Sequence, residues 1–448
     1  MQVDLQSFLR EYEKEHPEDV VRIDKEIGIE EEVSTLCVKL EEQCRYPIIY
    51  CTNVVNRMGR RYEMPLVFNL LASRSRCARA LGSDVRSVGR DFYNLSRLQT
   101  IPPVVVRREE ALVKQRVLRG EAIDLFSLPA LVHHRQDPGQ YFTAGFLTTI
   151  DPDSGVDNCS LQRGWIVGPR TMRCLLSPYS HNRYNYDKLE ARGEDTRMAY
   201  WIGHHPLVCL GAQVRLGYPE SHYGAIGGIL RQPLRLVPSE TLGNDFLVPA
   251  DAEVVIEGRL IANKRVPEGP FGEYTGYTGP QVPSLELQVS CMTHRQGAHW
   301  HDIFTGHADT LIMGSFALEG VTYEAVKQRV PSLKNVYLPL SGASRFNIYL
   351  QLEGARRGDA REAIMTALPL DYRHKHVFVF DEDIDIFDER QVMWALATRS
   401  RLDRDMMIFP KVRGSVLDPS IVDELTTKGG IDCTIPPGDT RPPRYSVR

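Results

Sequence analysis

Two carboxylates, Glu268 and Glu273, lie in a segment rich in proline and glycine, Val-Pro-Glu-Gly-Pro-Phe-Gly-Glu-Tyr-Thr-Gly at residues 266–276. Proline fixes φ at about −65° and glycine admits positive φ, so their alternation predicts a rigid turn rather than a helix. Paired carboxylates in a partly dry site can take different pKa values, so that one exchanges protons while the other stays charged. The segment therefore predicts proton-transfer chemistry, with two solvated glutamates on a surface loop as the alternative.

A third residue with suitable chemistry is Arg163, which follows a turn containing Asp157 and Asn158. A guanidinium group stays protonated and can bind a carboxylate through two parallel hydrogen bonds. An arginine next to two glutamates in a dry site would keep them ionised or poise them for proton transfer. A purely structural salt bridge is the alternative.

The string Pro267–Tyr277 closely resembles the signature loop of the UbiD family, the decarboxylases that use prenylated FMN. Other stretches resemble that family in the same order along the chain: Asn158-Cys-Ser-Leu-Gln-Arg163, then His181, then Val377 to Arg399, then Lys428-Gly-Gly-Ile-Asp-Cys-Thr434. The resemblance covers most of the chain, from about Phe126 to Thr434. The N-terminal part is similar only in general character.

The resemblance implies a catalytic set of Arg163, Glu268 and Glu273, in which Glu273 protonates the product carbon. It implies a non-oxidative, reversible decarboxylation of an aromatic, heteroaromatic or α,β-unsaturated carboxylic acid, by cycloaddition to prenylated FMN. A flavin prenyltransferase would supply that cofactor. Two other functions stay open, an FMN-dependent oxidoreductase on the same split barrel and a non-catalytic flavin-binding homologue.

The resemblance also implies a site for the flavin phosphate. Its cofactor-binding residues are Asn158, Ser160, Leu161, Gln162, Arg163, His181 and Lys428. Asn158 and His181 would bind a divalent metal of the manganese type, and potassium is a further ion in this expectation. The family's third metal ligand is a glutamate, whereas alignment on Gly227-Gly228 places His222 near that position, with Glu220 as the alternative. Imidazole can replace carboxylate on a transition metal.

A histidine-rich cluster and Lys428 could each have a structural rather than a functional role. The cluster His294, Arg295, His299, His301 and His307 lacks the spacing of a known metal-binding helix, and strand alternation would split it between two faces. We expect most of these histidines to be structural, with one or two, together with Arg295, lining the substrate pocket. For Lys428 the alternative is an exposed lysine of the tail.

Composition restricts the class of protein. The chain has 448 residues, of which 42% are hydrophobic and 25% charged, as in ordinary soluble globular proteins. It has no apolar run long enough to span a membrane and no signal-peptide pattern at its start, which predicts a cytoplasmic protein. Nine cysteines without a Cys-x-x-Cys motif predict buried, reduced thiols. A net charge of −4 gives no reason to expect nucleic acid as a partner.

Three domains would position these residues. Helices alternate with strands in residues 1–110, which predicts an N-terminal α/β domain. Residues 111–315 are β-rich, with expected strands at 141–150, 164–168, 207–214, 252–261 and 285–294, and resemble the family's flavin-reductase-like split β-barrel. Residues 316–448 predict a C-terminal α/β domain, and the resemblance implies that this domain mediates a homodimer or homohexamer. Its tail, Pro436 to Arg448, is expected to be extended.

Overall fold

A computed structural model of the chain describes residues 3–435 and 438. It divides into two compact units. The first unit comprises Met1–Val85 and Phe92–Gly314, and the second comprises Arg86–Asp91 and Ser315–Arg448. Apart from Gly438, the predicted tail after Ile435 lies outside the described residues.

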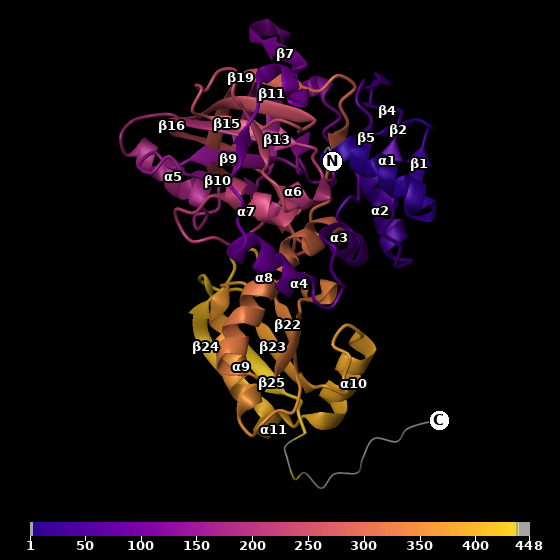
Figure 1. The fold of residues 1–448 in the computed structure, drawn as a ribbon, viewed down its shortest axis with the longest axis vertical. Coiled ribbons are helices and arrows are strands. Elements are labelled where there is room, and N and C mark those ends of the chain that lie inside the picture. Colours follow the sequence, from indigo (N-terminus) through magenta and orange to yellow (C-terminus); the bar gives the residue numbers. More distant parts are fainter. Residues whose placement is uncertain (1–2, 436–437, 439–448) are drawn as a thin grey trace. The chain divides into compact units, whose positions relative to one another are not determined.

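The first unit begins with helix α1 (Leu5–Glu15), whose cap is Asp4, and which buries Leu5, Leu9 and Tyr12 as its amphipathic spacing predicts. Near it lies a four-stranded sheet of β1 (Val20–Ile23), β3 (Ile48–Cys51), β5 (Leu66–Phe68) and β20 (Trp300–His301) (Figure 1). Strand β20 comes from much later in the chain and pairs with β5. This pairing ties the N-terminal layer to the segment that follows the barrel strands.

A nine-stranded antiparallel sheet forms the centre of the first unit. Its order is β10 (Asp157–Leu161), β9 (Phe146–Ile150), β13 (Thr196–Ile202), β16 (Val254–Glu268), β19 (Val282–His294), β12 (Thr171–Cys174), β11 (Gly164–Gly168) and β8 (Tyr141–Phe142), with β7 (Arg116–Arg119) paired to β19. Together with the helices, this sheet gives a mixed α+β fold with a flavin-reductase-like split barrel, which confirms the predicted fold class.

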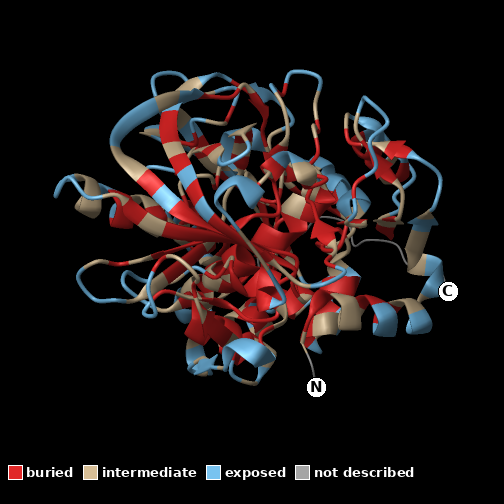
Figure 2. Ribbon diagram, turned by 90° about the horizontal axis from the view of Figure 1, so that it is seen from above, coloured by how far each residue is buried: buried red, intermediate tan, exposed pale blue. Residues whose placement is uncertain are grey.

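The long strand β16 carries one of the two glutamates of the proline-glycine segment. Its first half is buried and includes Val254, Ile256 and Leu260 of the main core, whereas residues 263–265 are exposed. In Figure 2 the buried residues gather along the strands and the exposed ones along the loops. Glu268, the last residue of β16, is buried again. The segment is therefore part strand, and not a loop throughout as the sequence predicted.

Two strand predictions in this unit need correction. Residues 207–214 form no strand, because helix α6 (Pro206–Gly211) occupies most of them. Pro206 stands at the first helical position, and His205 Nδ1 accepts a hydrogen bond from the N–H of Leu207. Every residue of α6 is buried, so its apolar run has no periodicity that separates helix from strand. The strand expected at 141–150 is divided into β8 and β9.

The remaining elements of the first unit are short. Its helices are α2 (Glu32–Glu41), α3 (Arg74–Leu81), α5 (His181–Glu190) and α7 (His222–Leu230), and α4 (Val88–Tyr93) crosses from the second unit into the first. Its small sheets are β2 (Ile27–Gly28) with β4 (Val54–Val55), β17 (Phe271–Gly272) with β18 (Thr278–Gly279), and β6 (Val104–Val105) with β14 (Arg235–Pro238) and β15 (Leu247–Pro249).

The second unit is an α/β layer. Its five-stranded sheet has the order β21 (Leu333–Tyr337), β22 (Asn347–Leu352), β23 (His376–Asp381), β25 (Leu425–Asp432) and β24 (Met406–Arg413). Alternate residues of β22 and β23 face two different cores. One core includes residues of α8 (Ala308–Arg329) and α9 (Asp359–Ala367), and the other includes residues of α10 (Glu389–Arg399); a short helix, α11 (Leu402–Asp405), precedes β24.

Among the described residues, no helix is both long enough and apolar enough to cross a membrane. All nine cysteines are free thiols, and eight of them are buried, as predicted; the exposed one is Cys44.

Candidate active site

Arg163 brings the two glutamates of the sequence prediction together. It lies in the short connection between β10 and β11. Its Nε and Nη2 atoms donate to the two carboxylate oxygens of Glu268 at 2.9 and 2.8 Å, and its Nη1 donates to Glu273 Oε1 at 2.5 Å. This is one bidentate ion pair and one single contact, so the three side chains form one charged group.

The group lies in a nearly dry environment. The side chain of Glu268 has no exposed surface, and those of Arg163 and Glu273 are 12% and 11% exposed. Burial alone would lower the pKa of Arg163, but the carboxylates of Glu273 and Glu268 outweigh it and raise that pKa above its ordinary value. The guanidinium therefore remains a permanent cation between two acids.

Aromatic rings support the arginine from one side. The guanidinium carbon of Arg163 lies 4.5 Å from the centre of the Phe271 ring, and that ring lies 4.5 Å from Tyr141. Tyr141 in turn stacks on Trp165 at 6.1 Å. Burial and the neighbouring Glu268 raise the pKa of Tyr141 above its ordinary value, so this phenol stays neutral. The Phe271 ring therefore makes a cation–π contact with the guanidinium, and Tyr141 packs on that ring.

The chain around Glu273 approaches its carboxylate closely. Strands β17 and β18 form a hairpin, in which the N–H of Glu273 donates to Tyr277 O at 2.9 Å. A Cβ atom at Gly279 would lie 3.0 Å from Glu273 Oε1. Glycine at that position therefore leaves room for the acid, a requirement that the sequence alone did not reveal.

The predicted metal ligands begin two helices. His181 is the first residue of α5 and His222 the first residue of α7, and the helices are capped by Ser180 and Ser221. Burial and the nearby His181 lower the pKa of His222 to about 3, and burial also lowers the pKa of His181. Both imidazoles are therefore neutral, the state in which imidazole binds metals.

His222 has one ring nitrogen available to a ligand. Its Nε2 lies 3.3 Å from Val214 O and donates to it, so Nδ1 carries the lone pair. Nδ1 is buried and has no hydrogen-bond partner among the described residues. A buried nitrogen without a partner suits a metal ion, because it would otherwise cost free energy.

Asn158 is oriented by a residue that the sequence prediction missed. Asn182, next to His181 on α5, accepts from Asn158 Nδ2 at 2.7 Å and donates to Ser160 Oγ at 2.9 Å. The amide oxygen of Asn158 takes no part in this contact and is the atom of its side chain suited to a metal ion. The sequence showed only an asparagine directly after a candidate ligand, and the structure shows that this asparagine is buried.

The other predicted site residues have varied environments. Leu161 ends β10, and Gln162 Nε2 donates to Leu175 O. The carboxylate of Glu220 is half exposed and pairs with Arg97 at 3.2 Å. Lys428 belongs to the second unit, where it lies on β25 and is buried, with Nζ 3.3 Å from Asp371 O. It is therefore not an exposed tail lysine.

The histidine cluster of residues 294–307 does not converge. His301 is fully buried, whereas His299 contacts Tyr50 and His307 contacts Glu41. Arg295 pairs with Asp4 at 2.8 Å, so its charge is engaged by the cap of α1. Residues 3–435 and 438 contain no group of three or more His, Cys, Asp or Glu side chains suited to a metal. The predicted set of Asn158, His181 and His222 has only two side chains of these four types, so it does not count as such a group.

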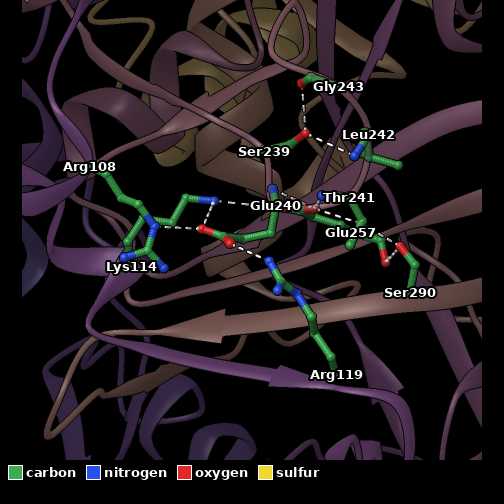
Figure 3. Close-up of polar contacts among 10 residues, drawn as sticks. All are labelled: Arg108, Lys114, Arg119, Ser239, Glu240, Thr241, Leu242, Gly243, Glu257 and Ser290. Atoms are coloured by element: carbon green, nitrogen blue, oxygen red, sulfur yellow. Dashed lines mark hydrogen bonds and ion pairs between the residues drawn. The ribbon is translucent and has the colours of Figure 1, made fainter.

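A second group of two glutamates and a cation lies elsewhere in the unit (Figure 3). Lys114, which is 1% exposed, lies 3.4 Å from Glu257 and 3.5 Å from Glu240. The Glu257 carboxylate also accepts from the N–H groups of Glu240 and Thr241 at 2.8 Å. These contacts fix the turn after β14 to β16, so a pair of glutamates with a cation is not by itself evidence of catalysis.

Models of known protein families match this chain along most of its length. Models of three domains match in order: the N-terminal domain of 3-octaprenyl-4-hydroxybenzoate carboxy-lyase at residues 12–95, its Rift-related domain at 104–308 and its C-terminal domain at 311–433. The chain therefore belongs to the UbiD family, and it is an enzyme of the carboxy-lyase class.

Relatives with stated activities share much of the chain. The anhydromevalonate phosphate decarboxylase of Methanothermobacter thermautotrophicus is 34% identical over 320 residues, which are 71% of this chain and 74% of that protein. The phenolic acid decarboxylase of Sedimentibacter hydroxybenzoicus is 30% identical over 452 residues, covering 97% and 92% of the two chains. The UbiD-class enzyme HmfF from Pelotomaculum thermopropionicum, solved with FMN, has a TM-score of 0.92 at 34% identity, with 99% and 97% covered.

Proposed function

We propose that this enzyme catalyses the reversible, non-oxidative decarboxylation of an aromatic, heteroaromatic or α,β-unsaturated carboxylic acid with prenylated FMN. An evolved dimeric form of HmfF, 33% identical to this chain, has been solved with prenylated FMN, which supports the choice of cofactor. When bound, that cofactor supplies the electron sink for loss of carbon dioxide. The protein binds and orients the substrate and delivers the proton that replaces the carboxylate.

The bidentate pairing of Arg163 with Glu268 carries the proposal. A buried cation that loses its partner costs several kcal/mol. If Glu273 gives up or gains a proton, its ion pair to Arg163 changes, but the guanidinium keeps Glu268 through two hydrogen bonds. One acid can therefore titrate while the other balances the charge. This division of roles explains why the site has two glutamates for one arginine.

We propose that the phosphate of the cofactor binds near the N-termini of α5 and α7, through a divalent metal held by Asn158, His181 and His222. The N–H groups of Tyr223 and Gly224 at the start of α7 already donate to Asp157 and Ser221, so the metal rather than these N–H groups would hold the phosphate. The orphaned Nδ1 of His222 and the neutral His181 suit a manganese-type ion. Potassium is a further candidate ion. The engagement of Glu220 by Arg97 favours His222 as the third ligand.

The proposal is tested by expressing the chain with a flavin prenyltransferase and measuring the mass of the flavin released from the purified protein. The probe acids are 4-hydroxybenzoate, 2-furoate and cinnamate, one for each proposed class. We expect prenylated FMN, and carbon dioxide release from at least one class without consumption of NAD(P)H. Ordinary FMN with NAD(P)H oxidation would instead indicate an oxidoreductase, and flavin binding without turnover a non-catalytic homologue.

We also propose that the protein forms a homodimer or homohexamer in the cytoplasm. The support is the second unit, which presents several exposed apolar side chains, among them Met393, Ile408 and Val422. Light scattering on the purified protein measures the oligomeric state directly. A monomer at micromolar concentration would contradict this part of the proposal.

A further inference from the structure

Asp137 is a buried carboxylate that no part of the proposed reaction uses. Its side chain has no exposed surface. Its Oδ2 accepts from the backbone N–H of His134 at 3.0 Å and lies 3.1 Å from His134 Nδ1, while its Oδ1 accepts from the N–H of Gly272 at 3.2 Å. The N–H of Asp137 donates back to His134 O at 3.0 Å, which closes a tight turn. One carboxylate thus joins this turn to the segment between the two glutamates.

His134 packs directly on the same segment. A Cβ atom added to Gly272 would overlap the imidazole ring of His134 at three ring atoms. The ring cannot move aside cheaply, because Asp137 holds its Nδ1 and the rings of Phe271 and Phe304 lie 6.1 and 5.2 Å away. Glycine at position 272 is therefore a steric requirement of the contact between the turn and the segment.

Two different kinds of contact consequently hold Glu273. Arg163 holds its carboxylate from the side-chain end, at 2.5 Å. Asp137 and His134 hold the backbone of the preceding residue, Gly272, without touching either glutamate carboxylate in any contact recorded for the described residues. A proton donor must be held within a few tenths of an ångström of its working geometry, and a misplacement of 1 Å can cost about 10²-fold in rate.

We infer that Asp137 and His134 are positioning residues that set the place of the Glu273 carboxylate through the backbone of Gly272. This inference rests on the proposed function, since it assigns Glu273 the proton transfer. Neither residue transfers the proton itself. Loss of the Asp137 carboxylate leaves the N–H of Gly272 and the ring of His134 without their acceptor, so the hairpin of β17 and β18 loses its anchor.

The first test is Asp137→Asn in the holoenzyme, with the probe acid on which the wild type is most active. Asparagine keeps the shape but turns an NH2 group toward donors. We expect kcat to fall on the order of 10- to 100-fold, with KM and flavin retention changed less than about twofold. The matched control is Asp124→Asn, which alters a carboxylate that accepts from the nearby backbone N–H of Phe126 and, among residues 3–435 and 438, from no other donor; it should retain wild-type kcat.

A second arm uses the steric contact. Gly272→Ala should lose as much kcat as Asp137→Asn, because its methyl group collides with the ring of His134. Adding His134→Ala to that variant removes the collision, and we expect at least part of the lost rate to return. The effect of His134→Ala is also measured alone. If the rate losses of the two single variants simply add in the double variant, the two residues act independently, and the inference is contradicted.

A third readout does not depend on turnover. Hydrogen–deuterium exchange of the peptide that spans residues 267–276, and of the turn at 134–137, should be faster in Asp137→Asn than in the wild type, while the rest of the chain exchanges equally. Unchanged exchange together with wild-type kcat would overturn the inference. If the wild type decarboxylates none of the probe acids, the proposed function fails, and the exchange measurement still decides whether Asp137 anchors the segment.

Discussion

Arg163 binds Glu268 through two parallel hydrogen bonds of 2.9 and 2.8 Å, and the carboxylate it holds has no exposed surface. Glu268 is the last residue of β16, whereas Arg163 lies in a connection 105 positions earlier. The pair therefore fixes the end of the longest barrel strand to the segment that carries Asn158. This geometry suits Glu268 as a permanent counter-charge to Arg163.

Glu268→Gln should destabilise the protein and lower its activity. The variant replaces a charge-assisted bidentate contact with at most one neutral hydrogen bond, which leaves Arg163 to Glu273 alone. We expect a loss of about 2 kcal/mol in the free energy of unfolding. Urea unfolding measures it, and the turnover assay measures the loss of rate. A variant as stable and as active as the wild type would show that Glu268 is not the counter-charge.

His222→Ala should lower the metal content of the purified protein. One of three protein ligands is lost, and with it much of the affinity of the site. Elemental analysis after equal dialysis gives the measurement, and Glu220→Gln is the matched control, since Glu220 pairs with Arg97. Unchanged metal in His222→Ala with reduced metal in Glu220→Gln would transfer the role to Glu220.

His301→Gln should reduce the loss of stability at acid pH. Burial lowers the pKa of His301 from 6.5 to about 3, so between these values the unfolded chain takes up a proton that the folded protein refuses. Stability due to this group therefore falls as pH drops from 7 to 5, by about 2 kcal/mol. Burial raises the pKa of the adjacent Asp302 to about 7, which acts in the opposite sense, so the variant and the wild type are compared at each pH. Parallel stability curves for the two proteins would contradict the prediction.

Lys114→Met should cost stability without affecting the cofactor. The lysine is almost fully buried against Glu240 and Glu257, so its removal takes a cation away from the buried Glu257 carboxylate, at a cost of about 2 kcal/mol. Arg108→Gln is the control, because Arg108 contacts the same Glu240 but is 54% exposed and should cost less than about 1 kcal/mol. Flavin retention should be equal in both variants. Loss of flavin from Lys114→Met alone would mean that this cluster serves the cofactor.

The sequence predicted the parts of the site that local patterns encode. The prolines and glycines around Glu268 and Glu273 predicted a non-helical segment, which in the structure is partly strand, and the resemblance led to Arg163. The structure brings all three side chains together. Position in the fold was harder to predict. Nothing local to Asp137 indicates that its carboxylate reaches Gly272, which lies 135 positions later. Contacts of this length depend on the closure of the barrel, which no short window of sequence describes.

The prediction of a strand at residues 207–214, where helix α6 lies, was wrong for a different reason. All of its side chains are buried, so neither the period of a strand nor that of a helix is visible in its sequence. Strand β20 was likewise missed, because two residues, Trp300 and His301, complete a sheet whose other strands all precede residue 70. Short strands of this kind gain their stability from the neighbours they pair with.

The central claim is that Glu273 delivers the proton, and Glu273→Gln tests it most directly. Glutamine keeps the shape and can still bind Arg163 but cannot transfer a proton, so folding and flavin content should stay near wild type. Decarboxylation should fall on the order of 10²–10⁴-fold, and exchange of product hydrogen with deuterated water should be lost, because it uses the same proton path in reverse. A Glu273→Gln enzyme with near wild-type decarboxylation and full exchange would show that the proton comes from another group.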